Sequence, residues 1–335
     1  MKYYINVKKK LAHMANLKDH KLVKVCNNHA SRLPVNKFLI AYSGGMDSSV
    51  LLDCFFQLSH IIPIKIRSIH INHGLSNEAD LFETHCRKIC KEYGIKHVTK
   101  NLNLKITSNI EEQCRKARYR ELCENCQDDE VIITAHHEED QIETFFLRVI
   151  RGSGVRGLSC MKETTLYDNS LLGRPFLQIQ KEEIKKYSED NSIKYIEDIS
   201  NNNNKYDRNF LRNELIPLLK SRWPSVNKNI INNILVHDIQ SAYTTDTVND
   251  VLPNFLGSSN NELLVETLLD KPFHLKVIVL HEWVYLEGRI LLSLKHIREI
   301  IKILDTNNDS NPLFTFGNIK IRKIRNILSL SLNKS

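Results

Sequence analysis

The chain has 335 residues, of which 41% are hydrophobic and 26% are charged, as in an ordinary globular protein. This composition excludes bulk disorder, collagen and coiled coil, and no apolar run reaches the roughly 18 residues that a membrane helix needs. The formal net charge of +8 is concentrated at the two ends of the chain, whereas residues 101–150 are acidic. Basic ends suit a polyanionic partner such as nucleic acid, but a genome whose base composition favours Lys and Asn produces the same charge.

The first half of the chain alternates short apolar runs with segments of helical spacing. Strands are expected at residues 37–42, 64–72, 97–102 and 130–135. Helices are expected at residues 47–58, 78–93, 109–126 and 138–151. Four such alternations predict an α/β fold, a doubly wound parallel sheet with helices on both faces.

The pattern changes after Gly152, and a second domain is expected. The basic, glycine-rich residues 151–157 are predicted to be a mobile loop. Further helices are expected at residues 180–191, 208–220 (bent or ended by Pro217), 226–239, 272–286 and 293–304. The other segments are expected to be extended at 193–197, turn-rich at 240–262 and a hairpin at 314–321 with 327–332. We predict a basic N-terminal extension at 1–30, a first domain at 31–222 and a mainly helical second domain at 223–335.

The eight cysteines and the N-terminus bear on the compartment. The N-terminal residues lack the apolar core of a secretory signal, and eight cysteines in a chain of this length do not suggest a disulfide framework. We therefore expect a cytoplasmic protein without membrane association. Cys123 and Cys126 have the spacing of metal ligands, and Cys86 and Cys90 lie one helical turn apart. A four-cysteine zinc site and a set of small apolar helix residues both fit this pattern.

The most specific motif lies between the first strand and the first helix, Ser43-Gly44-Gly45-Met46-Asp47-Ser48-Ser49. Glycines carry no Cβ, so backbone N–H groups can approach phosphate oxygens, and the helix N-terminus attracts the anion. Ser43 and Ser48 add hydroxyl donors. The carboxylate of Asp47 would repel phosphate unless a Mg²⁺ ion lay between them, so it favours a nucleotide site over an ordinary capped junction. The loop is not a Walker A motif, because no Gly-Lys-Ser/Thr follows.

This loop resembles the pyrophosphate loop of the N-type ATP pyrophosphatases, which cleave ATP between its α and β phosphates. Further motifs within residues 37–224 narrow the resemblance to the tRNA(Ile)-lysidine synthetase family. They are His70-Ile-Asn-His-Gly-Leu-Ser76, Ala117-Arg118-Tyr119-Arg120, Thr134-Ala-His-His-Glu-Glu-Asp140, Arg151-Gly-Ser-Gly-Val-Arg-Gly157 and Tyr206-Asp-Arg-Asn-Phe-Leu-Arg212. The resemblance implies an adenine nucleotide alpha hydrolase-like fold, whereas residues 245–332 match the family's substrate domain only in length and pattern.

The resemblance also implies a reaction, that of an ATP-dependent, C–N bond-forming ligase acting in tRNA modification. The wobble cytidine of tRNA(Ile) with a CAU anticodon attacks the ATP α-phosphorus, and pyrophosphate leaves. The ε-amine of free L-lysine then attacks C2 of that base, and AMP leaves, so that the lysidine-bearing tRNA reads AUA as isoleucine. A tRNA thiolase with paired cysteines and a non-catalytic RNA-binding module are the alternatives. The sequence leaves open whether the chain forms a homodimer.

Acidic and histidine candidates follow the strands whose carboxyl ends should form the site. Asp47 and Asp140 are the expected Mg²⁺ ligands, although Asp140 also suits a first-turn helix charge. His136 is expected to contact nucleotide or to act in proton transfer. Either His136 or Asp140 is the candidate base that takes a proton from lysine.

Arginines complete the predicted site. Arg115 and Arg118 are three residues apart on one helix face, so they are expected to bind phosphates, Arg118 at ATP and Arg115 at the tRNA. A salt bridge to Glu111 or Glu112 is the other interpretation of this pair. The remaining expected tRNA or substrate contacts are Arg151, Arg156, Arg208 and Arg212.

Overall fold

The computed structural model describes residues 20–74, 79–102, 110–198, 203–307 and 310–332. Contacts divide the chain into two compact units. The first comprises Met1–Glu143 and Met161–Trp223, and the second comprises Thr144–Cys160 and Pro224–Ser335. The second unit therefore includes Thr144–Cys160, a segment that the sequence analysis assigns to the first domain.

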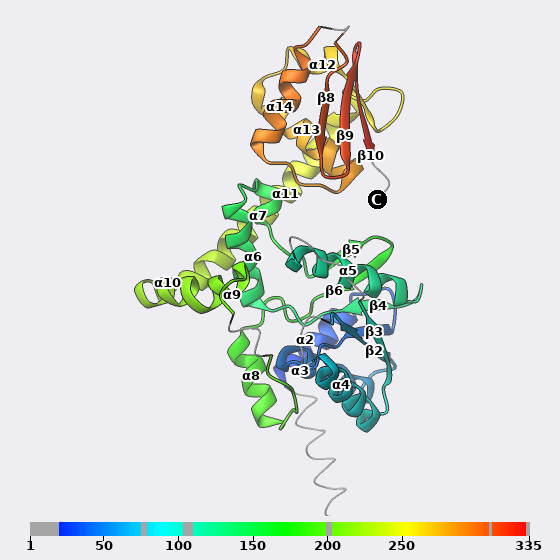
Figure 1. The fold of residues 1–335 in the computed structure, drawn as a ribbon, viewed down its shortest axis with the longest axis vertical. Coiled ribbons are helices and arrows are strands. Elements are labelled where there is room, and N and C mark those ends of the chain that lie inside the picture. The colour runs from blue at the N-terminus through cyan, green and yellow to red at the C-terminus, as the bar shows by residue number, and fades with distance from the viewer. Residues whose placement is uncertain (1–19, 75–78, 103–109, 199–202, 308–309, 333–335) are drawn as a thin grey trace, which may run out of the picture. The chain divides into compact units, whose positions relative to one another are not determined.

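A six-stranded sheet forms the centre of the first unit, in the order β3-β2-β1-β4-β6-β5 (Figure 1). Its strands are β1 (Lys37–Ala41), β2 (Lys65–Asn72), β3 (Lys96–Asn101), β4 (Val131–Ile133), β5 (Thr164–Tyr167) and β6 (Ser170–Gly173). Neighbouring strands run parallel except for the β5–β6 hairpin. The predicted doubly wound parallel sheet is confirmed. The hairpin was not predicted, because two strands of four residues each carry little periodic signal.

Apart from α2, which lies in the predicted N-terminal extension, the helices of the first unit follow the predicted pattern closely. They are α2 (Lys21–Ala30), α3 (Met46–Ser59), α4 (Ala79–Tyr93), α5 (Ile110–Asn125), the first part of α6 (Glu138–Ile150), α8 (Lys181–Asp190), α9 (Asp207–Phe210) and α10 (Ile216–Arg222). A π-helical stretch at Leu211–Leu215 joins α9 to α10. It lies just before Pro217, which lacks the N–H that a regular α-helical turn needs. No strand forms at the predicted extended segment 193–197.

Residues 21–30 are part of the core, which corrects the prediction of an extension over 1–30. Leu22 and Cys26 of α2 are fully buried and join the cluster around α3. Residues 1–19 lie outside the described residues. Strands β1 and β4 are buried on both faces, as parallel strands covered by helices are. In β1, Phe38 and Ile40 face the α2–α3 cluster, and Leu39 faces the cluster that includes α5.

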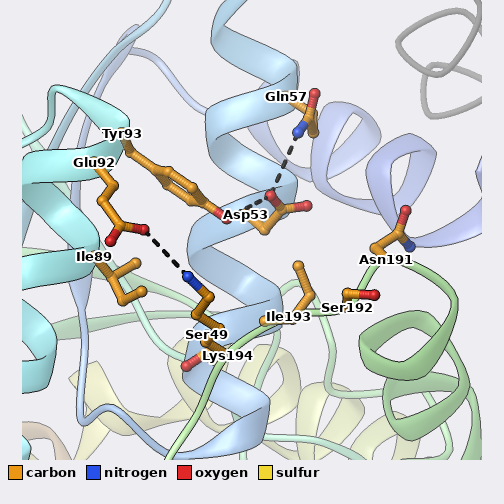
Figure 2. A pocket seen from close by; sticks show the side chains of 10 residues that line it. All are labelled: Ser49, Asp53, Gln57, Ile89, Glu92, Tyr93, Asn191, Ser192, Ile193 and Lys194. Carbon is orange, nitrogen blue, oxygen red and sulfur yellow. Dashed lines mark hydrogen bonds and ion pairs between the residues drawn. The ribbon is translucent and has the colours of Figure 1, made fainter. Parts of the chain in front are cut away.

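A buried carboxylate ties three helices of the first unit together. Asp53 of α3 is 4% exposed and accepts hydrogen bonds from Tyr93 of α4 at 3.0 Å and from Tyr187 of α8 at 2.6 Å. Gln57 donates to the same carboxylate at 3.3 Å, beside a cavity between α3 and α4 (Figure 2). A buried carboxylate needs such donors, so this network explains why an acidic residue is tolerated inside α3.

The second unit combines helices with a four-stranded antiparallel sheet of order β7-β10-β9-β8. Its helices are the end of α6, α7 (Val155–Leu158), α11 (Val226–Val251), α12 (Val265–Leu269), α13 (Phe273–Gly288) and α14 (Leu294–Leu304), with a short 3-10 turn at Leu252–Asn254. Its strands are β7 (Glu262–Leu264), β8 (Leu313–Phe316), β9 (Ile319–Ile324) and β10 (Ile327–Leu332). The core surrounds Trp283, which is fully buried.

Three local predictions for the second unit are wrong. Residues 240–251 continue helix α11, because tertiary packing outweighs the weak helix propensity of their Thr and Asn residues. The run 314–321 is two strands, since Gly317 adopts a φ of +61° and reverses the chain. Its second part, in β9, does pair with β10 as the predicted antiparallel hairpin. The loop at 151–157 contains the start of helix α7.

Lys323 departs from the outward-facing pattern of basic residues on β9. It is 3% exposed, and its ammonium group donates to the carbonyls of Leu304 and Thr306 at the end of α14. A cation suits a helix C-terminus, where carbonyls lack intrahelical partners. Lys320 and Arg322 are exposed on the other face of the same strand. No helix in the described part of the chain has the length and apolarity needed to cross a membrane.

Candidate active site

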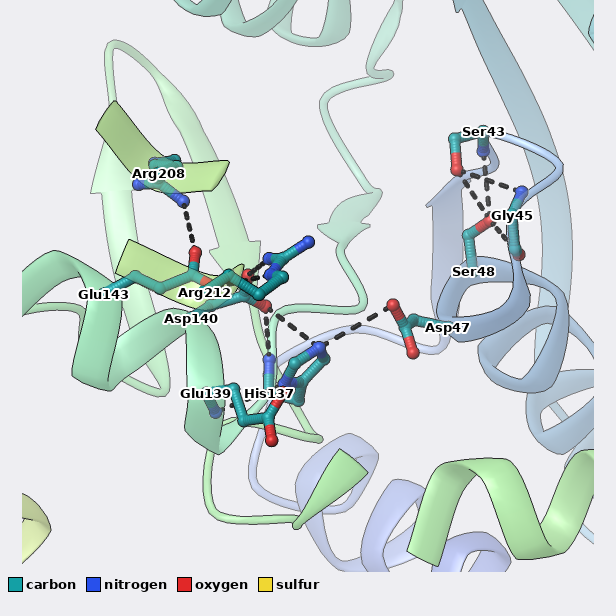
Figure 3. A network of polar contacts seen from close by, with 10 residues as sticks. All are labelled: Ser43, Gly45, Asp47, Ser48, His137, Glu139, Asp140, Glu143, Arg208 and Arg212. Atoms are coloured by element: carbon teal, nitrogen blue, oxygen red, sulfur yellow. Dashed lines mark hydrogen bonds and ion pairs between the residues drawn. The ribbon is translucent and has the colours of Figure 1, made fainter. Parts of the chain in front are cut away.

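The loop between β1 and α3 is folded by its own hydroxyl groups. The Oγ atoms of Ser43 and Ser48 lie 2.9 Å apart, and Ser48 also donates to the carbonyl of Gly45 at 3.0 Å (Figure 3). No side chain caps α3, so its first N–H groups remain available to an anion. Met46 contributes only backbone here, because its side chain packs against the core. This arrangement is suited to holding phosphate groups.

Gly44 is required by both conformation and space. Its φ is +88°, and a Cβ at this position would lie 3.1 Å from the Sγ of Cys86 and 3.3 Å from Phe82. Its carbonyl accepts a hydrogen bond of 3.0 Å from the N–H of Ile196. The segment that follows α8 thereby holds the loop against α4.

Two carboxylates from neighbouring strand ends converge on one histidine. His137 Nε2 lies 3.7 Å from Asp47 Oδ2 and 3.6 Å from Asp140 Oδ2 (Figure 3). The His137 N–H donates to Asp140 at 2.9 Å, and Nδ1 accepts the N–H of Glu139. Asp47 follows β1 and Asp140 follows β4, between which the strand order reverses, and open α/β sheets bind ligands at such a switch point.

The electrostatics of the site keep Asp140 ionised and His136 neutral. Burial alone would raise the pKa of Asp140, but His137, His136 and Arg212 lower it to about 2. Burial lowers the pKa of His136 to about 3, and nearby arginines act in the same direction. Asp140 is therefore a carboxylate at neutral pH, and His136 is an uncharged imidazole of low basicity.

The residues present suit a Mg²⁺ ion. Asp47 Oδ1 is buried and has no hydrogen-bond partner among the described residues, while Asp47 Oδ2 faces Asp140 across His137. Mg²⁺ is typically held by one or two carboxylates together with substrate phosphates. Asp47 and Asp140 would supply the carboxylates, and the loop at 43–48 would supply the phosphate site.

Arg208 and Arg212 are brought to this site by Glu143, which the sequence analysis did not assign. Arg212 Nε donates to Glu143 at 2.7 Å and its Nη2 lies 3.6 Å from Asp140. Arg208 Nη1 lies 3.8 Å from Glu143, whose side chain is fully buried. Burial raises the pKa of Glu143, and Arg212 opposes that shift. The sequence feature that could have identified Glu143 is its position three residues after Asp140, which places both on one face of a helix.

Arg115 and Arg118 lie beside an aromatic residue. Their guanidinium carbons are 5.1 and 5.5 Å from the ring centroid of Tyr119, a cation–π arrangement. Within the described residues, Glu112 is paired with Lys116, so it is not the partner of either arginine. The side chain of Glu111 lies outside the described residues. Phosphate binding by Arg115 and Arg118 stays a prediction.

Arg151 and Arg156 belong to the second unit. Arg151 is exposed at the end of α6. Arg156 is bound in an ion pair with Glu282 of α13. The charge of Arg156 is therefore already neutralised within the unit, in contrast to the predicted contact with tRNA.

The contacts of these four cysteines fit small apolar helix residues better than ligands of a zinc ion. Cys86 and Cys90 are fully buried, and Cys123 and Cys126 donate to backbone carbonyls. In the part of the chain that the structure describes, no group of three or more His, Cys, Asp or Glu side chains is placed to hold a metal ion.

Loss of the bridging imidazole in His137→Ala is expected to raise the Mg²⁺ concentration for half-maximal activity about tenfold. The imidazole lies between Asp47 and Asp140, and without it the two carboxylates lose the group that both of them face. Titration with Mg²⁺ of the ATP-cleaving activity that the sequence predicts measures this effect. His281→Ala, at a partly buried histidine of α13, is the control. An unchanged Mg²⁺ requirement in His137→Ala would show that His137 does not position the carboxylates.

Comparison with known proteins agrees with this geometry. Residues 14–219 match the family model of the PP-loop domain. The chain is 36% identical over 299 residues to the tRNA(Ile)-lysidine synthase of Coxiella burnetii, covering 88% of this chain and 66% of that protein. It is 32% identical over 305 residues to the tRNA(Ile)-lysidine synthase of Histophilus somni, and this match covers 90% of this chain and 71% of that protein. The chain thus spans about two thirds of the length of these relatives.

A solved structure shares the fold. The U34-tRNA thiolase NcsA from Methanococcus maripaludis, described with its [4Fe-4S] cluster, is similar with a TM-score of 0.51 and 19% identity. The match covers 64% of this chain and 77% of that one. At this identity the similarity concerns the fold alone. The family model and the lysidine synthase relatives together place this chain in the tRNA(Ile)-lysidine synthase family of PP-loop proteins.

Proposed function

We propose that the chain ligates free L-lysine to C2 of the wobble cytidine in tRNA(Ile) with a CAU anticodon. In the first step the cytidine O2 attacks the α-phosphorus of ATP, a P–O bond forms and pyrophosphate leaves. In the second step the ε-amine of lysine attacks C2, the C–O bond to AMP breaks and a proton is released. The observation that carries the proposal is the phosphate loop facing the Asp47–His137–Asp140 group, in a chain of this family.

The phosphate loop supports the ATP step. Nucleotidyl transfer depends mainly on positioning and on stabilisation of the charge that develops on the phosphate oxygens. The hydroxyls of Ser43 and Ser48 and the open N-terminus of α3 supply donors for that charge. Mg²⁺ held by Asp47 and Asp140 would add Lewis-acid stabilisation of the same oxygens when it is bound.

The low pKa values of His136 and Asp140 favour binding roles over proton transfer. A proton leaves the lysine ammonium group, whose pKa is about 10.4 in water, before the amine attacks. With a pKa of about 3 for His136 and about 2 for Asp140, both groups are weak proton acceptors at neutral pH. We therefore propose that His136 contacts the nucleotide and that Asp140 is a Mg²⁺ ligand.

A lysine-transfer assay tests the function. The protein is incubated with CAU-anticodon tRNA(Ile), ATP, Mg²⁺ and labelled lysine, and label in the tRNA is counted. The same tRNA with uridine at the wobble position is the control, because uracil has a carbonyl where cytosine has its amino group. Transfer dependent on ATP and on the wobble cytidine is expected. Absence of label with a folded preparation that binds ATP would refute the proposed function.

Neutralising Lys320 and Arg322 is expected to weaken tRNA binding and to reduce the slope of log affinity against log salt by about 1.5 to 2. Both residues are exposed on β9, on the face of the sheet opposite the core. The double variant Lys320→Gln/Arg322→Gln is compared with Lys185→Gln/Lys186→Gln on the exposed face of α8, which changes charge equally. Filter binding over a range of KCl concentrations measures the slope. Equal slopes for wild type and the β9 variant would remove this face from the tRNA interface.

A further inference from the structure

The ion pair between Arg156 and Glu282 is a bidentate contact within the second unit. Arg156 Nε donates to Glu282 Oε1 at 3.1 Å, and Nη2 bonds both Glu282 Oε2 and the hydroxyl of Thr245. The guanidinium also lies 4.1 Å from the ring centroid of Tyr285. The side chain of Glu282 is 5% exposed and that of Arg156 is 17% exposed. An arginine that is bidentate, stacked on a ring and largely shielded from solvent is held in one geometry.

This pair fastens a short segment to the body of the second unit. Helix α7, which carries Arg156, packs against α11. The segment is tightly folded, since a Cβ on Gly157 would lie 2.6 Å from the Cβ of Ser153. Ser159 donates to the carbonyl of Arg156 at 2.7 Å. Residues 151–160 are therefore a fixed part of the second unit.

A short turn at residues 151–154 joins this segment to helix α6, which leads into the active site. This helix runs from Glu138 to Ile150, and the two units meet within it, between Glu143 and Thr144. Its first two turns carry Asp140 and Glu143, which both contact Arg212, and Asp140 faces Asp47 across His137. A continuous α-helix transmits a displacement at one end to the other, because its backbone hydrogen bonds resist bending.

We propose that Arg156 and Glu282 are positioning residues, which rests on the proposed function. By locking α7 to the second unit, they make α6 follow that unit. The positions of Asp140 and Glu143 then depend on how the second unit holds the tRNA. The pair thus couples tRNA binding to the arrangement of the carboxylates that serve adenylation. Such a coupling needs an element that both sites influence, and α6 is that element.

The double variant Arg156→Gln/Glu282→Gln tests the coupling while protecting the fold. Removing one partner would leave a buried charge unpaired, whereas removing both charges together is close to neutral for stability. The matched control is Arg67→Gln/Glu130→Gln, at a bidentate pair in the first unit that is equally buried, with side-chain exposures of 17% and 3%. That pair lies on β2 and just before β4, and its other hydrogen bonds among the described residues go to Asn125 and Gln127.

Three measurements are made on each full-length protein, well below its melting temperature. They are the rate of tRNA-dependent pyrophosphate release, the affinity for ATP without tRNA, and the melting temperature itself. We expect the Arg156/Glu282 variant to release pyrophosphate about tenfold more slowly at saturating tRNA, with ATP affinity within twofold of wild type. The Arg67/Glu130 variant is expected to keep the wild-type rate.

Two outcomes overturn the coupling. A wild-type rate in the Arg156/Glu282 variant would show that the pair only stabilises the second unit. An equal loss in both variants would show that the rate follows stability and not the position of α6. The failure of the proposed function is distinguishable, because in that case wild-type protein transfers no lysine in the parallel assay.

Discussion

Replacing Asp47 by asparagine is expected to slow ATP-dependent adenylation of the tRNA roughly a thousandfold, or about 4 kcal/mol in the activation barrier. The substitution keeps the size of the side chain and removes its charge. Its buried Oδ1 has no hydrogen-bond partner among the described residues, so the charge is available to a Mg²⁺ ion. With asparagine at position 47, Asp140 would be the only one of these two carboxylates left to hold the ion. Pyrophosphate release in the presence of tRNA measures the rate.

Binding of tRNA should survive the same substitution. Asp47 lies in the phosphate loop, and neutralising an acidic residue adds no repulsion toward a polyanion. Asp190→Asn, at the exposed end of α8, is the control for loss of one negative charge. Asp47→Asn protein that still turned over ATP would show that Asp47 does not hold the metal ion.

The second large effect is expected for Gly44→Ala, which should reduce kcat/KM for ATP roughly a hundredfold, or about 3 kcal/mol. An alanine is strained at a φ of +88°, and its Cβ would press against Cys86 and Phe82 of α4. The loop can relieve this pressure only by moving, and movement displaces the N–H groups that face the phosphates. Initial rates at varied ATP, together with the melting temperature, separate loss of the site from loss of the fold.

Gly94→Ala is the matched control for conformational strain. Gly94 ends α4 with a φ of +67°, and a Cβ there would meet no atom within 4 Å. Both alanines therefore share the left-handed conformation, and only the one at position 44 is crowded. We expect Gly94→Ala to lower the melting temperature by a few degrees and to keep kcat/KM. Equal loss of activity in both variants would contradict a special requirement at Gly44.

The sequence predicted the part of the fold that depends on local patterns. The runs at 37–42, 64–72 and 97–102 became β1, β2 and β3, because short runs bounded by turn residues favour strands over helices. The phosphate loop was equally visible, since its glycines and serines have a local conformational and chemical purpose. The hairpin β5–β6 and the end of α11 were missed, because packing against distant residues stabilises them.

The predicted site was partly reassigned by contacts between distant residues. Periodicity could not separate His136 from His137, which are adjacent, and the tertiary structure placed His137 between the carboxylates of Asp47 and Asp140. In the same way, sequence patterns offered no means of distinguishing Arg156 from Arg212, and both were predicted to contact the substrate. Arg212 lies beside Asp140, whereas Arg156 is paired with Glu282.

The charge pattern shows the same division. The sequence alone determined that the ends are basic, that residues 101–150 are acidic and that a phosphate loop follows the first strand. Only the tertiary structure decided which charges remain available to a ligand. Lys323 donates to backbone carbonyls at the end of α14, while Lys320, three residues earlier, is exposed. The physical reason is that composition and spacing count charges, whereas burial and pairing with residues far along the chain determine whether each charge is free to bind.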